Sequence, residues 1–170
     1  MRIYLSGALA SAVNLEAACA QYDAIAIGLA AHGIETYVPH HSTHPRLHGQ
    51  STPFEVYETD SQRLLTCDAV LALLDAPSFG VGAEIALAVS NGRAVLGAVA
   101  SQRAARVSRY IAGLLSTGVF PNLVTYEDVS SLVRAVAPLL LEEIPLRSTQ
   151  GAGREESPAL VLPGEACLSS

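Results

Sequence analysis

Carboxylate side chains are the strongest candidates for chemistry in this sequence. Glu84 opens an apolar run directly after two closely spaced glycines, and Asp60 lies in an earlier helical segment. Two carboxylates that face one pocket can cleave a glycosidic bond, because one acts at the anomeric carbon while the other transfers a proton at the leaving group. Spacing alone leaves open whether these two converge. The simpler alternative for Glu84 is a helix N-terminus, where the helix dipole favours an acid by roughly 0.3–1 kcal/mol.

Sequence motifs of several other catalytic classes are absent. There is no Walker A pattern, and Gly80-Val81-Gly82 lacks the third glycine of a dinucleotide-binding fingerprint and follows the third expected strand instead of the first. The chain contains no lysine, which excludes Schiff-base chemistry, and no serine stands in a nucleophile elbow. Asp68 and Asp75, at the two ends of an expected strand, are interpreted as structural turn residues.

Most of the histidines lie in one segment, at His40, His41, His44 and His48. No helical HExxH pattern or second acidic cluster accompanies them, so we expect no metal ion there. A solvated loop that faces a ligand is the preferred interpretation. Within that loop, His41 could donate a hydrogen bond to an anionic ligand.

Composition and charge bound the class of protein. The 170 residues suit one domain, and half of them are hydrophobic, which excludes a disordered chain. The formal net charge of −6 argues against binding of a nucleic acid polymer, whereas backbone N–H groups and hydroxyls can still hold one phosphate. Neither an apolar run of roughly 18 residues nor a signal peptide is recognisable, so we expect a cytoplasmic protein without a membrane span.

Strand and helix patterns alternate along the chain. Apolar runs predict strands over 1–6, 34–38, 68–74, 94–99 and 122–126, and the intervening segments predict helices over 14–32, 53–66, 82–91, 104–115 and 128–141. This alternation predicts an α/β domain of flavodoxin-like (Rossmann-like) type, a five-stranded parallel sheet with helices on both faces and a ligand site at the carboxyl ends of the strands. Residues 1–144 form that domain, and 145–170 is expected to be a flexible tail because periodicity is lost there.

Three stretches together resemble one enzyme superfamily. They are Tyr4 in RIYLSGAL, Asp60 in YETDSQRLLTCDAVLALLD, and PSFGVGAEIALAVSNGRAVL with Glu84. These stretches are similar to the nucleoside 2-deoxyribosyltransferase superfamily, and most similar to its branch of 2′-deoxynucleoside 5′-monophosphate N-glycosidases. A later RVSRYIAG resembles the second serine-bearing helix of that branch. The likeness covers roughly residues 2 to 140.

The resemblance implies roles for the candidate residues. Glu84 would be the nucleophile that attacks C1′ and forms a glycosyl ester, and Tyr4 would orient its carboxylate. Asp60 would face the base and help to protonate or position it as it leaves. The substrate-binding residues would include Gly80 and Gly82, since the sugar must approach the backbone closely, and also Gly7.

Two serines bear on the substrate. Members of the superfamily that act on free nucleosides usually have an acid where this chain has Ser78, whereas members that act on 5′-monophosphates have serine, because a carboxylate would repel the phosphate. An ordinary serine turn is the alternative for Ser78. Ser108 resembles a phosphate-binding serine contributed by a neighbouring subunit, which implies a homodimer. The chain departs from the branch at Ala8, where a serine is usual, and Ser6 or Ser11 could replace that hydroxyl.

The sequence thus predicts a hydrolase that converts a nucleoside 5′-monophosphate to free base and (deoxy)ribose 5-phosphate, with no cofactor. Two alternatives remain. A nucleoside 2-deoxyribosyltransferase would pass the sugar to a second base in place of water. A nucleotide-binding sensor would keep the pocket without turnover, although Tyr4, Asp60 and Glu84 are all present in this chain.

Overall fold

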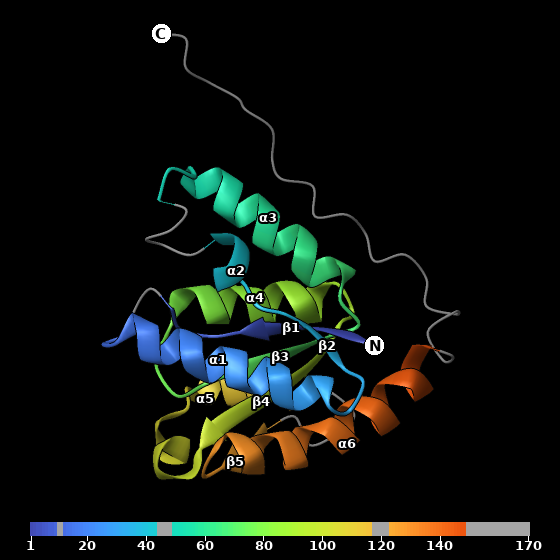
Figure 1. The fold of residues 1–170 in the computed structure, drawn as a ribbon. Coiled ribbons are helices and arrows are strands. Elements are labelled where there is room, and N and C mark those ends of the chain that lie inside the picture. The colour runs from blue at the N-terminus through green and yellow to red at the C-terminus, as the bar shows by residue number, and fades with distance from the viewer. Residues whose placement is uncertain (10–11, 44–48, 117–122, 149–170) are drawn as a thin grey trace, which may run out of the picture.

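The computed structural model describes residues 1–9, 12–43, 49–116 and 123–148. They form a five-stranded sheet in which all neighbouring strands are parallel and the order is β2-β1-β3-β4-β5. This topology confirms the predicted flavodoxin-like fold class (Figure 1). The strands are β1 (Arg2–Ser6), β2 (Glu35–Tyr37), β3 (Ala69–Leu73), β4 (Ala94–Ala100) and β5 (Leu123–Tyr126).

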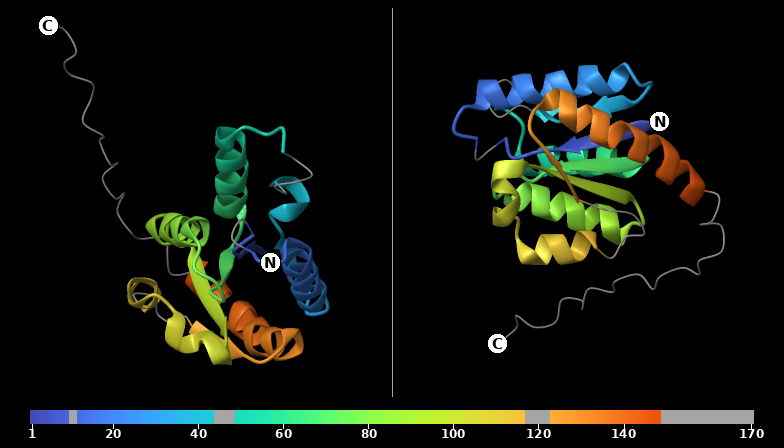
Figure 2. Two further views of the ribbon diagram at one scale, coloured as in Figure 1. Left: turned by 90° about the vertical axis from the view of Figure 1, so that its left-hand side faces the viewer. Right: turned by 90° about the horizontal axis from the view of Figure 1, so that it is seen from below.

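Helices cover both faces of the sheet. Helices α1 and α6 lie side by side on one face, and α3, α4 and α5 lie on the other (Figure 2). The helical elements are α1 (Leu15–Ala30), α2 (His40–Thr43), α3 (Pro53–Thr66), α4 (Phe79–Ser90), the 3₁₀ helix η1 (Ser101–Arg106), α5 (Arg109–Leu115) and α6 (Val129–Ser148).

Local capping chemistry explains where several helices begin and end. Helix α3 starts with a capping box, in which the Thr52 hydroxyl accepts from the Glu55 N–H and the Glu55 carboxylate accepts from the Thr52 N–H. The side chain of Asn14 caps α1 in the same manner by accepting from the Ala17 N–H. After α1, Gly33 has a φ of 75°, which a residue with a side chain rarely adopts.

Three predicted boundaries were wrong. Helix α4 begins at Phe79 and not at Gly82, because Ser78 is its N-cap and the glycines form its first turn. The helix expected over 104–115 is two elements, η1 and α5, separated by extended backbone at Val107. Helix α6 continues to Ser148, past the end expected for it at 141, with Ile144 buried against the core. The rest of the expected tail, 149–170, lies outside the described residues.

Strand β1 separates two parts of the core. Ile3 and Leu5 pack with α1 and α6, whereas Tyr4 belongs to the cluster under α3 and α4. This alternation follows from the two-residue period of a strand, and it places Ser6 on the same face as Tyr4. Among the described residues, no helix combines the length and apolar character that crossing a bilayer requires.

Candidate active site

A cavity of about 740 Å³ lies at the carboxyl ends of β1 and β3, between α3 and α4. In the sheet, β2 lies on one side of β1 and β3 on the other, so the strand order reverses direction at β1. Parallel α/β sheets bind ligands at such a switch point. Five residues predicted for the site line the cavity: Gly7, Asp60, Ser78, Gly80 and Glu84.

Glu84 lies in the second turn of α4, and the first turn of that helix contains no acid. The helix dipole acts mainly within the first turn, so it does not explain this carboxylate. Instead, Tyr4 Oη donates to Glu84 Oε1 at 2.7 Å, and Ser6 Oγ donates to Oε2. Both donors come from the same face of β1 and have no exposed surface. Each oxygen of the carboxylate therefore has its own donor from a rigid central strand.

The electrostatics of Glu84 reflect a balance of burial and hydrogen bonding. Burial raises the pKa of Glu84, the hydrogen bonds from Ser6 and Tyr4 oppose that rise, and the negative charge of Asp60 adds to it. Burial, followed by the nearby charge of Glu84, also raises the pKa of Tyr4. Tyr4 is thus a neutral hydrogen-bond donor at physiological pH, and it stabilises the ionised form of Glu84.

Asp60 faces the same cavity from α3. The hydroxyl of Thr43, on α2, lies 3.2 Å from Oδ1 and 3.1 Å from Oδ2 of Asp60. Burial raises the pKa of Asp60, and the nearby hydroxyls of Thr43 and Tyr37 oppose the rise. The ring of Tyr37 in turn stacks on Tyr4, with 5.5 Å between centroids. The cavity therefore holds two carboxylates in different settings: Glu84 accepts from two buried donors on β1, and Asp60 lies beside the hydroxyls of Thr43 and Tyr37. Such pairs can divide nucleophilic and acidic roles.

The predicted substrate-binding residues of α4 cap the helix and form its first turn. The Oγ of Ser78 accepts from the Val81 N–H at 3.3 Å, as an N-cap does. A Cβ added at Gly80 would meet only this Oγ, at 3.7 Å, so the helix start is open on that side. Gly82 lies one position beyond Val81 in the same helix. Gly7 has a packing role as well, because a Cβ there would lie 2.4 Å from the buried ring of Tyr22.

Ser108 and His41 lie away from this cavity. Ser108 lines a second cavity of about 650 Å³, between α4 and η1-α5, that shares Ser78 and Val81 with the first. Its side chain is exposed and makes no capping hydrogen bond to α5. His41 lies next to Asp23 of α1, with 2.8 Å between Nε2 and Oδ1.

The structure also places the remaining hydroxyls and acids. Ser6 has no exposed surface and donates to Glu84, so it does not replace the hydroxyl missing at Ala8; Ser11 lies outside the described residues. Asp68 accepts from the Arg2 N–H at 2.7 Å, and Asp75 accepts from the Ala100 N–H at 2.7 Å. These contacts join strands, in agreement with the structural interpretation of both acids.

Sequence reasoning missed the functional arrangement of Ser6 and Thr43. A signal existed for Ser6, since a strand residue two positions after Tyr4 must face the same side. Nothing local indicated Thr43, because its contact with Asp60 joins the short helix α2 to α3.

Two comparisons concern individual relatives and solved structures. A protein of Thermofilum pendens that is proposed to be a 2′-deoxynucleoside 5′-phosphate N-hydrolase is 34% identical over 89 residues, which span 52% of this chain and 61% of that protein. The structure is similar to that of the CMP N-glycosidase of Clostridium botulinum, with a TM-score of 0.60 and 18% identity over 82% of this chain and 99% of that one. A conserved protein of Enterococcus faecalis shares the fold at a TM-score of 0.53 and 21% identity, over 86% of this chain and 98% of the other.

The family comparison covers most of the domain. The sequence pattern of the nucleoside 2-deoxyribosyltransferase family matches residues 3–137, from β1 into α6. This range includes all the residues of the cavity described above. The chain therefore belongs to the nucleoside 2-deoxyribosyltransferase family.

Proposed function

We propose that this protein hydrolyses the N-glycosidic bond of a nucleoside 5′-monophosphate to the free base and (deoxy)ribose 5-phosphate. The observation that carries the proposal is the Glu84 carboxylate, which is held by Tyr4 and Ser6 in a cavity that Asp60 also lines. A buried carboxylate with both oxygens oriented is suited to attack on an electrophilic carbon. The relative from Thermofilum pendens, proposed to act on 2′-deoxynucleoside 5′-phosphates, supports the same assignment.

The reaction would proceed in two displacements at C1′. In the first, a Glu84 oxygen bonds to C1′ while the bond from C1′ to the base nitrogen breaks, and the base leaves with that electron pair and a proton from Asp60. In the second, Asp60 takes a proton from water, whose oxygen displaces Glu84 from C1′. Burial raises the pKa of both carboxylates, and the first step uses Asp60 in its protonated form and Glu84 in its ionised form. Both carboxylates then return to their starting states.

The N-terminus of α4 is the proposed site of the substrate phosphate. Unpaired N–H groups and the helix dipole favour an anion there, which suits a chain without lysine. Ser78 caps the helix without adding a negative charge to its first turn. Along the helix, Ser78 and Glu84 are separated by about 9 Å at the usual rise per residue, and a pentose 5-phosphate is long enough to reach from one to the other.

Base transfer is the second candidate function, because the family is named for it. The two reactions share the glycosyl ester on Glu84 and differ in whether water or a second base attacks it. Nothing in the first displacement separates them.

A homodimer completes the proposal, with Ser108 reaching the neighbouring site. Ser108 does not line the cavity of its own Glu84, and the neighbouring aromatic rings of Phe79 and Tyr110 are 102% and 79% exposed. A second copy of the chain would cover these rings. In a twofold dimer, each protomer then lends Ser108 to the site of its partner.

Intersubunit complementation tests the dimer. Glu84→Gln and Ser108→Ala are each expected to be weakly active alone. If Ser108 acts across the interface, a mixed dimer contains one site with both native residues, so co-refolded variants should recover about a quarter of wild-type activity on statistical mixing. A monomeric chain by light scattering, or no recovery on mixing, would exclude the shared site.

The decisive experiment is chromatographic product analysis with a panel of ribo- and deoxyribonucleoside 5′-monophosphates and the matching nucleosides. We expect free base from monophosphates alone, and a loss of at least about a thousandfold in Glu84→Gln. Release from nucleosides, or release only after a second base is added, would replace the proposal by a transferase. Tight nucleotide binding without any product would indicate a sensor.

A further inference from the structure

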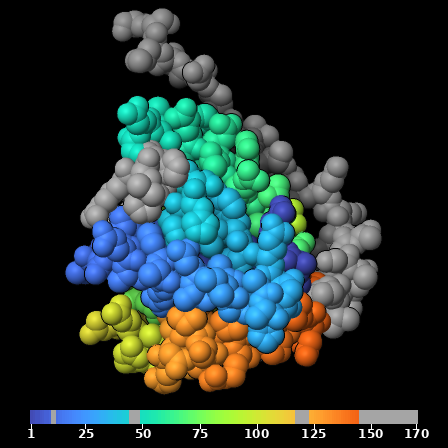
Figure 3. All heavy atoms as spheres, viewed as in Figure 1, coloured from blue at the N-terminus to red at the C-terminus, as the bar shows by residue number. Residues whose placement is uncertain are grey.

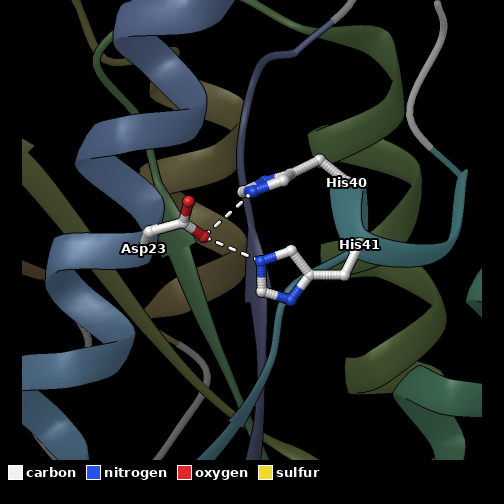
Figure 4. Close-up of side chains that lie close together, drawn as sticks. All are labelled: Asp23, His40 and His41. Atoms are coloured by element: carbon white, nitrogen blue, oxygen red, sulfur yellow. Dashed lines mark hydrogen bonds and ion pairs between the residues drawn. The ribbon is translucent and has the colours of Figure 1, made fainter. Parts of the chain in front are cut away.

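A cluster of two imidazoles and one carboxylate lies at the junction of α1 and α2. Asp23 comes from α1, and His40 and His41 are the first two residues of α2. Both Nε2 atoms point at the same carboxylate oxygen, Asp23 Oδ1, at 3.0 Å from His40 and 2.8 Å from His41 (Figure 4). The cluster lies outside both cavities, so the proposed glycosidase reaction does not use it.

We propose that Asp23, His40 and His41 bind a divalent transition-metal ion, with Zn²⁺ as the best match. Imidazole nitrogen and carboxylate oxygen are the ligand set that zinc takes in sites with three protein ligands. Around a tetrahedral ion with bonds near 2.0 Å, ligand atoms lie about 3.3 Å apart. The three ligand atoms here lie within 4.8 Å of one another, so small side-chain shifts would admit an ion.

Two histidines, and not one, contact the carboxylate of Asp23. Two consecutive histidines turn the same ring nitrogen toward Asp23 Oδ1, with their rings 4.5 Å apart and nearly perpendicular. The two ring nitrogens and the carboxylate oxygen thus lie close enough together for one ion to take all three as ligands. His40 is buried and its ring lies near that of Tyr22, which fixes one ligand in place.

An ion could reach this cluster from solvent. The side chains of Asp23 and His41 are 43% and 59% exposed, whereas that of His40 is 6% exposed. In the space-filling view, the surfaces of α1 and α2 adjoin on one face of the molecule (Figure 3). The fourth position of the ion would therefore be open to water, and the ion would join α1 to α2.

The ion would brace one wall of the active-site cavity. Pro39 precedes the two histidines and lines the cavity, and Thr43 ends the same short helix and hydrogen-bonds Asp60. A metal ion bound to the folded chain also stabilises it by mass action. Zinc is therefore expected to raise the thermal stability of the protein and to leave the chemistry to the two carboxylates.

The test is calorimetric titration of the untagged, chelator-treated chain with Zn²⁺, together with Co²⁺ as a spectroscopic substitute. We expect one Zn²⁺ per chain, an absorption spectrum of low-symmetry Co²⁺ with nitrogen ligands, and a rise in Tm with zinc. Asp23→Ala and His41→Ala should each weaken zinc binding by at least about tenfold. His32→Ala, which removes an exposed histidine elsewhere, is the matched control and should bind zinc as the wild type does.

Two results would overturn the site. Absence of saturable zinc binding would leave the cluster as a hydrogen-bonded pair of histidines on one acid. Equal zinc affinity in the wild type, Asp23→Ala and His41→Ala would place any bound zinc elsewhere. Neither readout depends on glycosidase activity, so failure of this site and failure of the proposed function are distinguishable.

Discussion

Glu84 is held differently from the ordinary acids of this chain. Asp128, for example, accepts from the Ser131 N–H near the start of α6, is exposed, and has a lowered pKa because of these backbone and side-chain hydrogen bonds. Burial raises the pKa of Glu84 in spite of two donors. The folded chain thus keeps this carboxylate more basic, and more nucleophilic, than a surface glutamate.

Two substitutions should move the pH dependence of the reaction in opposite directions. Tyr4→Phe removes a hydrogen bond that lowers the pKa of Glu84, so the acid limb of kcat/KM should shift to higher pH. Asp60→Asn removes a negative charge that raises the pKa of Glu84, so the same limb should shift to lower pH. We also expect Tyr4→Phe to lower kcat by about tenfold to a hundredfold.

The measurement is kcat/KM for a good monophosphate substrate at a series of pH values, for the wild type and both variants. Acid limbs that coincide in all three proteins would show that Glu84 does not control the limb. Shifts in the same direction would contradict the assigned coupling between Glu84 and Asp60.

At the scale of an element, the N-terminus of α4 combines a structural and a substrate-binding role, and one substitution separates the two. Aspartate caps a helix as well as serine does, so Ser78→Asp should retain stability to within about 0.5 kcal/mol, whereas Ser78→Ala should lose about 1 kcal/mol. The new carboxylate would repel a phosphate at 4 Å by about 4 kcal/mol at an effective dielectric of 20, so KM for monophosphates should rise about a hundredfold or more.

Urea unfolding and substrate kinetics on the same preparations check this prediction. Nucleosides without phosphate serve as the control substrates and should not be discriminated against by Ser78→Asp. An unchanged KM for monophosphates would place the phosphate away from the α4 N-terminus.

The loop after β1 is packed too tightly for a side chain at Gly7. An alanine Cβ there would lie 2.4 Å from the ring of Tyr22, which is 6% exposed, so Gly7→Ala should destabilise the protein by about 1–3 kcal/mol. Gly113 lies within α5 with open space around it, and Gly113→Ala should be neutral or stabilising by up to about 1 kcal/mol. The midpoints of urea unfolding of the two variants test this difference in stability. Equal midpoints would contradict the prediction.

Elements with local signals could be predicted from the sequence, and the others could not. Helix α3 has the predicted bounds because its start is determined by a capping box, Thr52 and Glu55, that lies within four consecutive residues of the sequence. The start of α4 was placed too late because Gly80 and Gly82 are typical of turns, and only the hydrogen bond from Val81 to Ser78 shows that the helix has already begun. The helix expected over 104–115 is divided into η1 and α5 by extended backbone at Val107, and no residue type there predicts the break.

At the scale of the whole molecule, the buried active-site acid lowers stability at neutral pH. Folding raises the pKa of Glu84, so the folded chain binds the proton more tightly than the unfolded chain does. Stability from this group is fully present below the pKa of the unfolded chain and is lost as pH rises through the folded pKa. Glu84→Gln, which never ionises, should therefore be more stable than the wild type at neutral pH, and the difference should vanish near about pH 4.

Urea unfolding of the wild type and Glu84→Gln across this pH range tests the linkage. The exposed Glu142→Gln is the matched control, and we expect no comparable pH-dependent gain from it. If the stability of Glu84→Gln relative to the wild type fell as the pH rose from acid to neutral, the sign would be reversed. That result would contradict a raised pKa of Glu84 in the folded chain.

The candidate site could be predicted only through resemblance, because its contacts span the chain. Tyr4 and Glu84 are 80 residues apart, and no local spacing indicates their hydrogen bond. Asp23 and His41 are 18 residues apart, and the sequence pattern did not connect them either. Such contacts depend on how strands and helices pack, and packing is a property of the assembled sheet.

The pairing of β1 with β3 has a consequence for how activity can be used. Tyr4 and Ser6 pair with Val70 and Ala72 in the native register. A shift of one residue would turn Ile3 and Leu5 toward Glu84, because adjacent strand residues face opposite sides. Such a molecule would keep its helices and lose both donors. The specific activity of a refolded sample therefore measures the fraction of molecules in which β1 has its native register. Circular dichroism does not distinguish these molecules from those with a shifted β1.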